Sequence, residues 1–370
     1  MKVAINTRFL LPQLEGIGTF THEICRRMVL QNKNIEFHFL FDRKFDRKYI
    51  YADNIVPHLA FPPARHPILW QLWYEWTIPR YLNKINADVF LSPDNFCSLK
   101  TRVPTLMVTH DLAFEHYPNH IRRSHLNFFK RYSKKYHERA DKIACVSKFT
   151  QQDVIKKYQI HESKTLVTYN GCNESFNTLS DKEKALVKLN IAEGKDYLLF
   201  IGALHPRKNI SRLVQAFEKF KHQNPSDIKL VLVGRMAWNN GELKSIIKNS
   251  VVKEDILQIG HVKNVEGIIS SATALCYPSL FEGFGIPILE AFQSGVPVMT
   301  SNVSSMPEVA ENAALLIDPM DIDALSRGMN DIINDPQLRN TLIHKGSKRV
   351  ESFSWDKSAV QIFDALKDIS

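Results

Sequence analysis

The chain has 370 residues, of which 44% are apolar and 24% are charged, as in an ordinary globular protein. This length favours two α/β domains over one, because single hydrophobic cores stop growing well below it. The net charge of +9 is uneven: residues 1–176 hold 26 Lys and Arg against 16 Asp and Glu (+10), whereas the remainder holds 22 against 23 (−1). A pI near 9.1 suggests a nucleic-acid-binding protein, but no RNA or DNA motif accompanies the charge, so we expect no nucleic-acid partner. The basic half should favour some other anionic partner.

The sequence predicts neither a signal peptide nor a membrane span. The N-terminus MKVAINTRFL has no long apolar core and no small-residue cleavage site. The uncharged stretch Gly267–Phe281 is too short to cross a bilayer and contains Pro278. The five cysteines form no CxxC pair and no cluster with zinc spacing. We therefore expect no metal site, buried thiols in a reducing compartment, and a cytoplasmic location.

Short apolar runs alternate with longer helical patterns, which is typical of βαβ units and parallel sheets. The first half contains strand candidates at Lys2–Asn6, Ile35–Phe41, Asp88–Leu91, Thr105–Val108, Lys142–Val146 and Leu166–Thr168. The second half contains them at Tyr197–Ile201, Lys229–Gly234, Ile256–Ile259, Ala274–Tyr277, Val296–Thr300 and Ala314–Ile317. Between the two series, the polar stretch Asn173–Gly194 is interpreted as a linker.

We therefore predict an α/β fold of two doubly wound, Rossmann-like domains that face each other across a cleft. The N-terminal domain would span residues 1–175, with a C-terminal helix at about 353–370 packing back onto it. The second domain would span residues 176–352. Ligands of such sheets bind beyond the carboxyl ends of the strands, so the cleft is the expected active site.

The first motif is the loop Glu15-Gly16-Ile17-Gly18, which precedes a helix predicted at Thr21–Gln31. Its GxG resembles a dinucleotide fingerprint, but it lacks the third glycine and follows an overlong loop. We interpret it as a backbone loop that contacts phosphate or substrate. His110 follows the strand Thr105–Val108 and could contact a sugar hydroxyl or share a proton. The alternative, a structural histidine, is common in a chain with 14 of them.

A basic helical pattern follows between Ile121 and Arg139. Leu126, Phe129, Tyr132 and Tyr136 share one helical face, and most of the cations lie beside or opposite it. One interpretation is an interfacial helix on anionic lipid, which would place the protein peripherally on the cytoplasmic face of the inner membrane. The other is an amphipathic helix whose apolar face lies in the core.

Two motifs in the second half carry the chemistry. Arg207 and Lys208 follow the strand Tyr197–Ile201 and a glycine turn, where adjacent cations can hold a diphosphate and offset its growing charge. Glu282 lies in a loop with Phe284 and Gly285. Glu290 lies about one turn inside the helix that this loop opens. Carboxylates suit paired sugar and ribose hydroxyls, because each oxygen accepts a hydrogen bond. The simpler interpretations are surface cations at a helix start and two solvated glutamates in a βα turn.

Taken in order along the chain, these motifs resemble the retaining GT-B glycosyltransferases called glycosyl transferases group 1. The segments that carry the resemblance are the Gly16–Gly18 loop, HDL at His110, ACVSKFT, YNGCN, GALHPRKN and the E-x7-E element from Glu282 to Glu290.

This resemblance implies a nucleotide-sugar donor and no essential metal or other cofactor. It implies that Glu290 binds the donor ribose, and that Glu282, with the amides near Phe284 and Gly285, binds hydroxyls of the transferred sugar. Arg207 and Lys208 would hold the diphosphate, and His110 would contact the sugar near its reacting carbon. Gly16 and Gly18 would close on the phosphates or the acceptor.

Finer features are similar to bacterial mannosyltransferases of surface polysaccharide synthesis. They are the segment around Trp73-Tyr74-Glu75-Trp76, VTHDLAF, and SSMPEVAENAALLIDP. The expected donor is GDP-mannose and the expected acceptor a saccharide or lipid-linked saccharide. The alternatives are a UDP-hexose donor and a sugar-nucleotide epimerase that shares the two-domain architecture. No basic residue directly follows GIGTF, which leaves the contacts of the first loop open.

Overall fold

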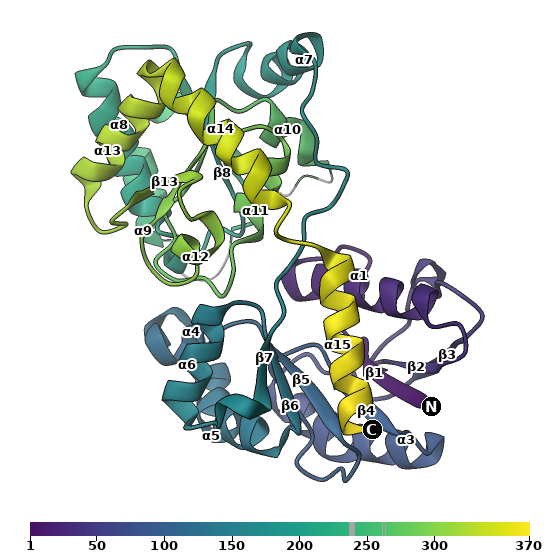
Figure 1. Cartoon of the computed structure of the whole chain (residues 1–370). Coiled ribbons are helices and arrows are strands. Elements are labelled where there is room, and N and C mark those ends of the chain that lie inside the picture. Colours follow the sequence, from purple (N-terminus) through teal and green to yellow (C-terminus); the bar gives the residue numbers. More distant parts are fainter. Residues whose placement is uncertain (237–240, 261, 263) are drawn as a thin grey trace. The chain divides into compact units, whose positions relative to one another are not determined.

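The computed structural model describes residues 1–236, 241–260, 262 and 264–370. The chain divides into two compact units (Figure 1). Unit 1 comprises Met1–Asn170 with Ser354–Ser370, and unit 2 comprises Gly171–Phe353. The chain therefore enters unit 2 before residue 175, where the sequence placed the boundary. Ser175 already belongs to unit 2, because its Oγ donates to Glu266 of that unit at 3.1 Å.

Unit 1 is built on a parallel sheet with the strand order β3-β2-β1-β4-β5-β6-β7. Its strands are β1 (Lys2–Asn6), β2 (Glu36–Phe41), β3 (Ile55–Leu59), β4 (Val89–Ser92), β5 (Thr105–Thr109), β6 (Lys142–Cys145) and β7 (Thr165–Val167). In the interior strand β1, Val3 pairs with Phe37 on one side and Val89 on the other. All the strands are parallel, so their carboxyl ends meet at one edge, where we expected the functional residues.

The strand β3 was not among the strands predicted from the sequence. Its sequence is IVPHL, and Val56, Pro57 and Leu59 are exposed, so it does not form an apolar run. It lies at the edge of the sheet, where the missing N–H of Pro57 leaves no ladder bond unmade.

The helices of unit 1 are α1 (Gly16–Gln31), α2 (Pro67–Leu72), the π-helical segment η2 (Trp73–Thr77), α3 (Ile78–Ile85), α4 (Ala113–His116), α5 (Arg123–Arg139), α6 (Lys148–Tyr158) and α15 (Trp355–Ile369). The helix α15 packs against α1, and both are seen together in Figure 1. An ion pair of 2.9 Å between Arg27 Nε and Asp356 Oδ1 links the two helices.

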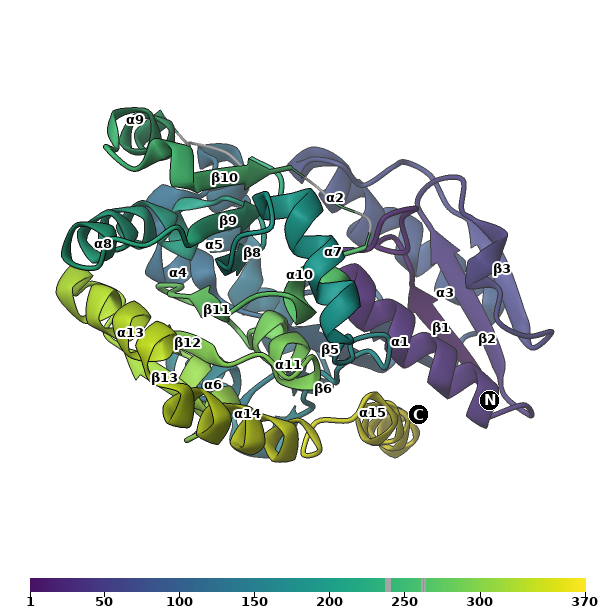
Figure 2. The same cartoon turned by 90° about the horizontal axis from the view of Figure 1, so that it is seen from above.

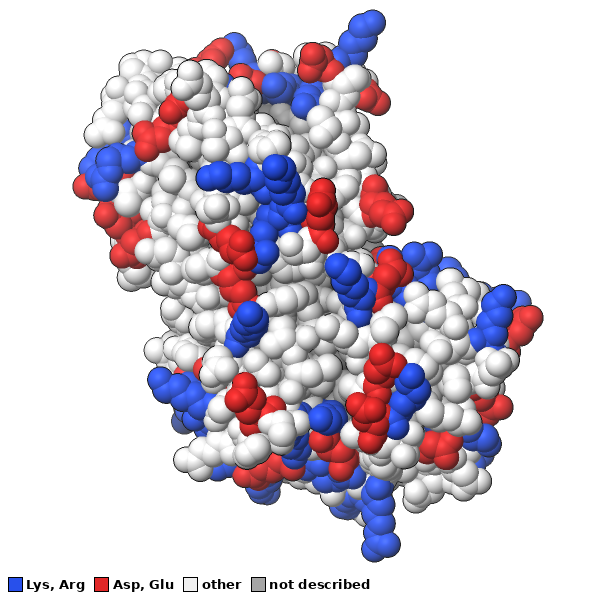
Figure 3. Space-filling view, in the orientation of Figure 1, with Lys and Arg blue, Asp and Glu red and all other residues white. Residues whose placement is uncertain are grey.

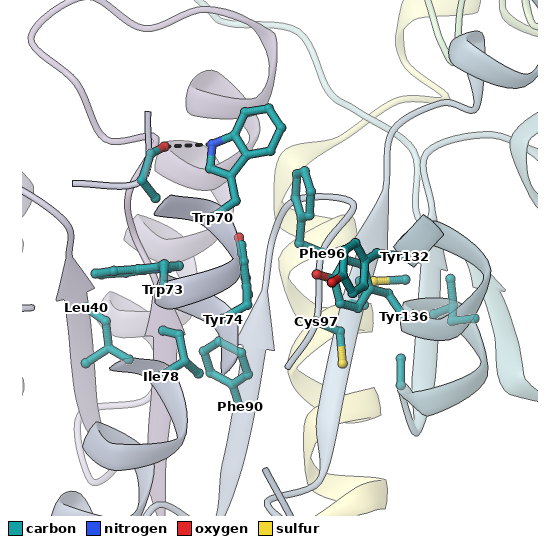
Figure 4. Packing of buried hydrophobic residues seen from close by; sticks show 14 of the residues in the cluster. Leu40, Trp70, Trp73, Tyr74, Ile78, Phe90, Phe96, Cys97, Tyr132 and Tyr136 are labelled. Atoms are coloured by element: carbon teal, nitrogen blue, oxygen red, sulfur yellow. Dashed lines mark hydrogen bonds between the residues drawn. The ribbon is translucent and has the colours of Figure 1, made fainter. Parts of the chain in front are cut away.

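The aromatic core of unit 1 lies between the sheet and the helices α2, η2, α3 and α5. Figure 4 shows part of it, including Trp73, Tyr74, Phe96 and Tyr136. The indole of Trp70 reaches a polar partner, because its Nε1 donates to the carbonyl of Ala64 at 2.9 Å. This core holds the loops at the carboxyl edge on a rigid base.

The aromatic face of α5 belongs to this core, so the interfacial interpretation is wrong for its apolar side. Tyr132 and Tyr136 are buried, and Leu126 and Phe129 pack against the same cluster. The cations of α5 remain exposed at Arg123, Lys130, Arg131, Lys134 and Lys135. On the face drawn in Figure 3, basic and acidic side chains are interspersed in small groups.

Unit 2 is built on a second parallel sheet, whose described strands have the order β10-β9-β8-β11-β12-β13. They are β8 (Tyr197–Ile201), β9 (Lys229–Val233), β10 (Ile256–Ile259), β11 (Ala274–Tyr277), β12 (Val298–Ser301) and β13 (Ala314–Ile317). The continuous apolar runs YLLFI and KLVLV form the neighbouring strands β8 and β9 and are buried but for Lys229, as fits a sheet covered on both faces.

The described helices of unit 2 are α7 (Asp181–Ala192), α8 (Ile210–Gln223), α9 (Gly241–Asn249), α10 (Glu266–Ser270), α11 (Ile286–Gln293), α12 (Met306–Ala310), α13 (Ile322–Asn334) and α14 (Pro336–Val350). In Figure 2, α13 and α14 run beside β13. The helix α7 corrects the linker interpretation of Asn173–Gly194. Ser180 and Glu183 form a capping box at its start, a signal that the polar composition obscured.

No helix within the described residues combines the length and apolar character that crossing a bilayer requires. The five cysteines are free thiols. Four are buried, and Cys172 is partly exposed.

Candidate active site

Arg207 and Lys208 lie in a short 3-10 turn, Pro206–Lys208, between β8 and α8. Asn209 ends this turn in the left-handed conformation (φ 60°), and its Nδ2 donates to the carbonyl of Pro319 at 2.6 Å. The turn is therefore fastened to the body of unit 2 and holds both cations at the carboxyl end of β8.

A second loop runs from the end of β11 to the start of α11. The oxygen of the Ser305 hydroxyl lies 2.9 Å from the carbonyl oxygens of both Glu282 and Phe284, which share its one proton. The backbone N–H of Glu282 donates to Ser304 Oγ at 3.1 Å. The two serines follow β12, so the neighbouring strand end fixes the backbone on both sides of Glu282.

The two loops meet in a charged cluster formed by Arg207, Lys208 and Glu282. Arg207 Nη1 lies 3.1 Å from Glu282 Oε2, and Lys208 Nζ lies 2.6 Å from Glu282 Oε1. Arg207 also donates to the carbonyl of Phe281, and Lys208 Nζ donates to Tyr277 Oη at 2.5 Å. The side chains of Arg207, Lys208 and Glu282 are 19%, 13% and 9% exposed. Arg207 and Lys208 are therefore not surface cations, and Glu282 is not a solvated glutamate.

Electrostatics keep Glu282 ionised. Burial alone would raise the pKa of its carboxyl, but the charges of Arg207 and Lys208 outweigh burial and lower the pKa to about 2. Burial and the neighbouring Glu282 raise the pKa of Tyr277 well above its ordinary value, so the phenol stays protonated. Two positive charges and one negative charge leave this cluster with one positive charge, which favours an anionic ligand.

Glycines form three of the turns at the carboxyl edge of the sheet in unit 2. A Cβ on Gly234, after β9, would lie 1.9 Å from the carbonyl oxygen of Gly202, after β8, and both residues have positive φ. Gly285 precedes α11 with φ 106°. Only glycine fits the close approach at Gly234, and the left-handed turn at Gly285 strongly favours it.

Glu290 lies in α11, and its charged neighbours differ from those of Glu282. Burial raises the pKa of Glu290 to about 7, and the charge of Glu266 adds to the rise. The charge of Glu290 in turn raises the pKa of the nearby Cys172 thiol, after the larger effect of burial. Unit 2 therefore presents two carboxylate environments: Glu282 between cations, and Glu290 beside another acid and half-protonated near neutral pH.

In unit 1, His110 follows β5 directly. Its Nε2 lies 2.8 Å from the carbonyl of Pro93, so this nitrogen carries the proton and Nδ1 keeps the lone pair. Its backbone N–H donates to Asn95 Oδ1 at 2.8 Å, and the Phe20 ring meets the imidazole edge-on with centroids 5.0 Å apart. Burial lowers the pKa of His110. The ring is neutral, oriented from several sides and able to accept a hydrogen bond at Nδ1.

The sequence predicted that this helix begins at Thr21, but in the structure α1 begins at Gly16. Gly16 and Gly18 therefore lie in the first turn of α1 and not in a loop before it. A Cβ on Gly18 would lie 2.7 Å from the carbonyl oxygen of Phe9, whereas a Cβ on Gly16 would meet nothing within 4 Å. Gly18 therefore permits the loop after β1 to pack on the helix, and Gly16 presents an open helix start.

Sequence reasoning missed a second polar network at the carboxyl edge of the sheet in unit 1. Arg8 Nε lies 2.8 Å from Asp94 Oδ2, which also accepts from Tyr74 Oη at 2.6 Å. Ser92 Oγ donates to Asp94 Oδ1 at 3.0 Å, and Asn6 Nδ2 donates to Tyr74 Oη at 2.8 Å. Asp94 and Arg8 each follow a strand end, which was the signal available. In unit 2, Tyr277, Ser304 and Ser305 were also missed, although Tyr277 ends β11 and the two serines follow β12.

Among the described residues, no group of three or more acidic, His or Cys side chains is arranged to hold a metal ion. The DxD letters at Asp321–Asp323 belong to a helix start. Asp321 Oδ1 caps α13 by accepting from the N–H of Ala324 at 2.9 Å, and Asp323 pairs with Lys219.

Comparison with known proteins assigns both halves of the chain. Residues 181–349 match the family described as "Glycosyl transferases group 1". Residues 14–176 match the family described as "Glycosyltransferase Family 4". The two matches meet near the division between the two units.

Similar proteins match most or all of the chain. The O-antigen chain mannosyltransferase B of Escherichia coli is 28% identical over 99% of this chain and 100% of its own. The O-antigen chain mannosyltransferase RfbU of Salmonella typhimurium is 28% identical over 72% of this chain and 71% of its own. The crystal structure of HepE from Anabaena, in complex with UDP and glucose, superposes with a TM-score of 0.79 at 16% identity, over 99% of both chains. The last likeness identifies the GT-B fold.

Proposed function

This chain belongs to the group 1 glycosyltransferases with a GT-B fold, and we propose that it transfers mannose from GDP-mannose to a saccharide or lipid-linked saccharide, with retention at the anomeric carbon. The observation that carries this proposal is the cluster at the carboxyl edge of unit 2 in which the buried Glu282 pairs with the largely buried Arg207 and Lys208.

The cluster suits a nucleotide sugar because its two kinds of group match the two parts of the donor. Arg207 and Lys208 would bind the diphosphate, and their surplus positive charge would offset the charge that develops as the glycosidic bond breaks. Glu282, with its pKa near 2, stays ionised and can accept hydrogen bonds from sugar hydroxyls at any physiological pH. The amides near Phe284 and Gly285 would contribute further donors.

Glu290 would bind the ribose hydroxyls of the donor. Its partly protonated carboxyl becomes a full acceptor once it ionises, and hydrogen bonds from two hydroxyls favour that form. Ribose binding should therefore strengthen as the pH rises through neutrality.

Unit 1 would supply the remaining contacts and bind the acceptor. His110, with its Nδ1 lone pair, would accept a hydrogen bond from the transferred sugar. Gly16 would let the phosphates or the acceptor approach the backbone of α1. The bond between the sugar C1 and the diphosphate oxygen would break while the acceptor oxygen bonds to C1 on the same face. The acceptor proton would pass to the departing diphosphate, and no metal ion would be required.

The mannosyl assignment rests on relatives. O-antigen chain mannosyltransferase B matches the whole chain, and its name gives mannose as the sugar and an O-antigen chain as the product. An O-antigen intermediate is a saccharide, so we propose an acceptor of that class. The UDP donor of a fold relative at 16% identity supports the architecture alone.

A thermal-shift series tests the donor. We expect GDP to raise the melting temperature more than UDP or ADP, because only a ligand that binds the folded state stabilises it. The shift should be unchanged by EDTA. A larger shift with UDP would replace the donor by a UDP-hexose, and loss of the shift in EDTA would refute metal independence.

Product analysis tests the reaction. Incubation of GDP-mannose with the protein and a mannose-containing acceptor should release GDP and yield an α-linked product, as read by NMR of the anomeric proton. Incubation without acceptor should leave the sugar nucleotide unepimerised. An epimerised nucleotide would overturn transfer in favour of isomerisation.

A further inference from the structure

An exposed apolar stripe runs along one side of the helical segment from α2 to η2. Ile68, Leu72 and Trp76 are spaced four residues apart and are 69%, 42% and 65% exposed. The opposite side of the same segment, with Trp73 and Tyr74, is fully buried and lies among the core residues of Figure 4. The segment is therefore apolar on both sides, although only one side is covered by this chain.

Folding of unit 1 does not account for the stripe. A surface helix ordinarily keeps polar residues on its outer side, and single exposed apolar residues are common whereas contiguous ones mark interaction sites. Phe61, which is 62% exposed, adjoins the same segment, because its carbonyl accepts from Thr77 Oγ1 at 2.7 Å. Aromatic and branched apolar side chains thus gather on one surface.

Cations predominate in the segments beside this stripe, and the exposed carboxylates Asp88 and Asp141 lie at the ends of these segments. Lys100 Nζ lies 4.0 Å from the centroid of the Trp76 ring. The helix α5 contacts α2 through Trp70, whose ring centroid lies 4.9 Å from that of His125. The exposed cations that these elements bring are Arg80 and Lys84 of α3, Lys100 and Arg102 of the following loop, and Arg122 and Arg123 at the start of α5.

Acidic side chains are nearly absent from these segments. Residues 61–84 contain one, Glu75, which is buried and accepts from the N–H of Leu99 at 3.2 Å. Residues 116–137 contain none. An apolar stripe with a tryptophan, bordered mainly by cations, is the pattern of a surface that lies on anionic lipid.

We propose that this surface, the α2 face, docks on an anionic phospholipid bilayer. The α2 face comprises the apolar Ile68, Leu72 and Trp76 and the six cations just named. The three apolar side chains enter the boundary between head groups and acyl chains, and the cations pair with lipid phosphates. The helix α5 contributes charge only, because its aromatic side is in the core. The proposal thus moves the apolar lipid contact from α5, where the sequence suggested it, to α2 and η2.

Docking of the α2 face does not depend on the identity of the transferred sugar. It goes beyond the proposed function, and nucleotide binding by unit 2 can be measured separately without lipid. A failure of docking and a failure of the donor assignment are therefore distinguishable.

Vesicle co-sedimentation of the full chain tests the proposal. We expect binding to phosphatidylcholine vesicles that contain about one third phosphatidylglycerol, little binding to phosphatidylcholine alone, and release by salt. The variant Ile68→Ser/Leu72→Ser should bind the anionic vesicles about tenfold more weakly, through the loss of inserted apolar surface. The variant Arg122→Glu/Arg123→Glu should lose at least as much, at about fivefold for each cation removed.

Matched controls come from unit 2. Leu186→Ser/Leu189→Ser removes two leucines of α7 that are 60% and 61% exposed. Lys244→Glu/Lys248→Glu reverses two exposed cations of α9. Both control variants should bind anionic vesicles as the unaltered chain does.

Tryptophan fluorescence tests insertion separately from attraction. Lipids brominated on their acyl chains should quench part of the emission of the bound protein, and this quenched component should disappear in Trp76→Phe, which keeps most of the binding. Equal binding to neutral and anionic vesicles, equal weakening by the control variants, or quenching that persists in Trp76→Phe would each overturn the proposal. So would the absence of vesicle binding, which would leave the α2 face to a protein partner.

Discussion

The variant Glu282→Gln tests whether the charged cluster is formed before any ligand binds. A depression of the pKa from 4.5 to about 2 means that the folded environment favours the ionised carboxylate. At about 1.36 kcal/mol per pH unit, this preference amounts to about 3 kcal/mol. Since the side chain is 9% exposed, solvent screens little of it. The variant keeps the shape of the side chain and loses this charge.

The sign of the pH dependence follows from the direction of the shift. The folded pKa is depressed, so the stabilisation by Glu282 is fully present above about pH 4.5 and is lost as the pH falls towards 2. The stability difference between the wild-type chain and Glu282→Gln should therefore shrink on going from about pH 7 to about pH 3.5. The expected decrease is roughly 1 to 2 kcal/mol.

Denaturant unfolding followed by circular dichroism at both pH values measures this difference. Two units need not unfold together, so the transition that the substitution moves is the one to analyse. Glu311→Gln, which removes an exposed carboxylate of unit 2, controls for the loss of one charge. A stability difference that is the same at both pH values would refute the idea that Arg207 and Lys208 form ion pairs with Glu282 in the unliganded protein.

Three further outcomes follow from the same geometry. Lys208→Ala should lower kcat/KM by about 10²- to 10³-fold in a transferase assay while the circular dichroism spectrum is retained, because one donor to the departing diphosphate is lost; near-normal turnover would remove Lys208 from the mechanism. The affinity for GDP, measured by calorimetry, should rise with pH through about 7 in the wild-type chain as Glu290 ionises, and Glu290→Gln should bind weakly at all pH values; a flat wild-type profile would contradict this role. Gly18→Ala should destabilise the protein by about 1 to 3 kcal/mol, since its Cβ would meet the Phe9 carbonyl at 2.7 Å, whereas Gly16→Ala should be neutral or stabilise α1 by up to about 1 kcal/mol. Equal melting temperatures for the two alanine variants would contradict the packing argument.

The parallel strands could be predicted because burial on both faces leaves a direct mark on the sequence. Tyr197–Ile201 is a strand as predicted, and its apolar run has no helical alternative of sufficient length. The strand Ile55–Leu59 could not be found in this way, because an edge strand with Pro57 is neither continuous nor alternating. The start of α1 was missed because two glycines predict a loop, whereas Gly18 serves the packing of that helix.

The candidate site divides along a similar line. Arg207, Lys208 and Glu282 could be proposed because each follows a strand end, and strand ends of parallel sheets converge. Their pairing could not be derived, because it depends on Ser304 and Ser305, which hold the Glu282 loop from 22 and 23 residues further along the chain. A hydrogen bond from a hydroxyl to a carbonyl more than twenty residues away leaves no periodic pattern in the sequence.

The π-helical segment η2 explains why Trp73 and Trp76 differ in exposure. Pro79 lacks an N–H, so the normal bond from residue 79 to Glu75 cannot form, and the chain widens into a π-helical segment in which Ile78 N donates to the carbonyl of Trp73. A period of 3.6 residues cannot separate the sides of such a segment, so Trp73 and Trp76 read alike in the sequence. In the structure Trp73 is fully buried and Trp76 is 65% exposed. We therefore attribute the exposed position of Trp76, though not that of Ile68 and Leu72 in α2, to the π-helical geometry beside Pro79. Replacing Pro79 with Ala should restore a regular helix, turn Trp76 from its position and weaken vesicle binding together with the quenching of its fluorescence. Unchanged binding in Pro79→Ala would show that the π-helical geometry does not set the α2 face.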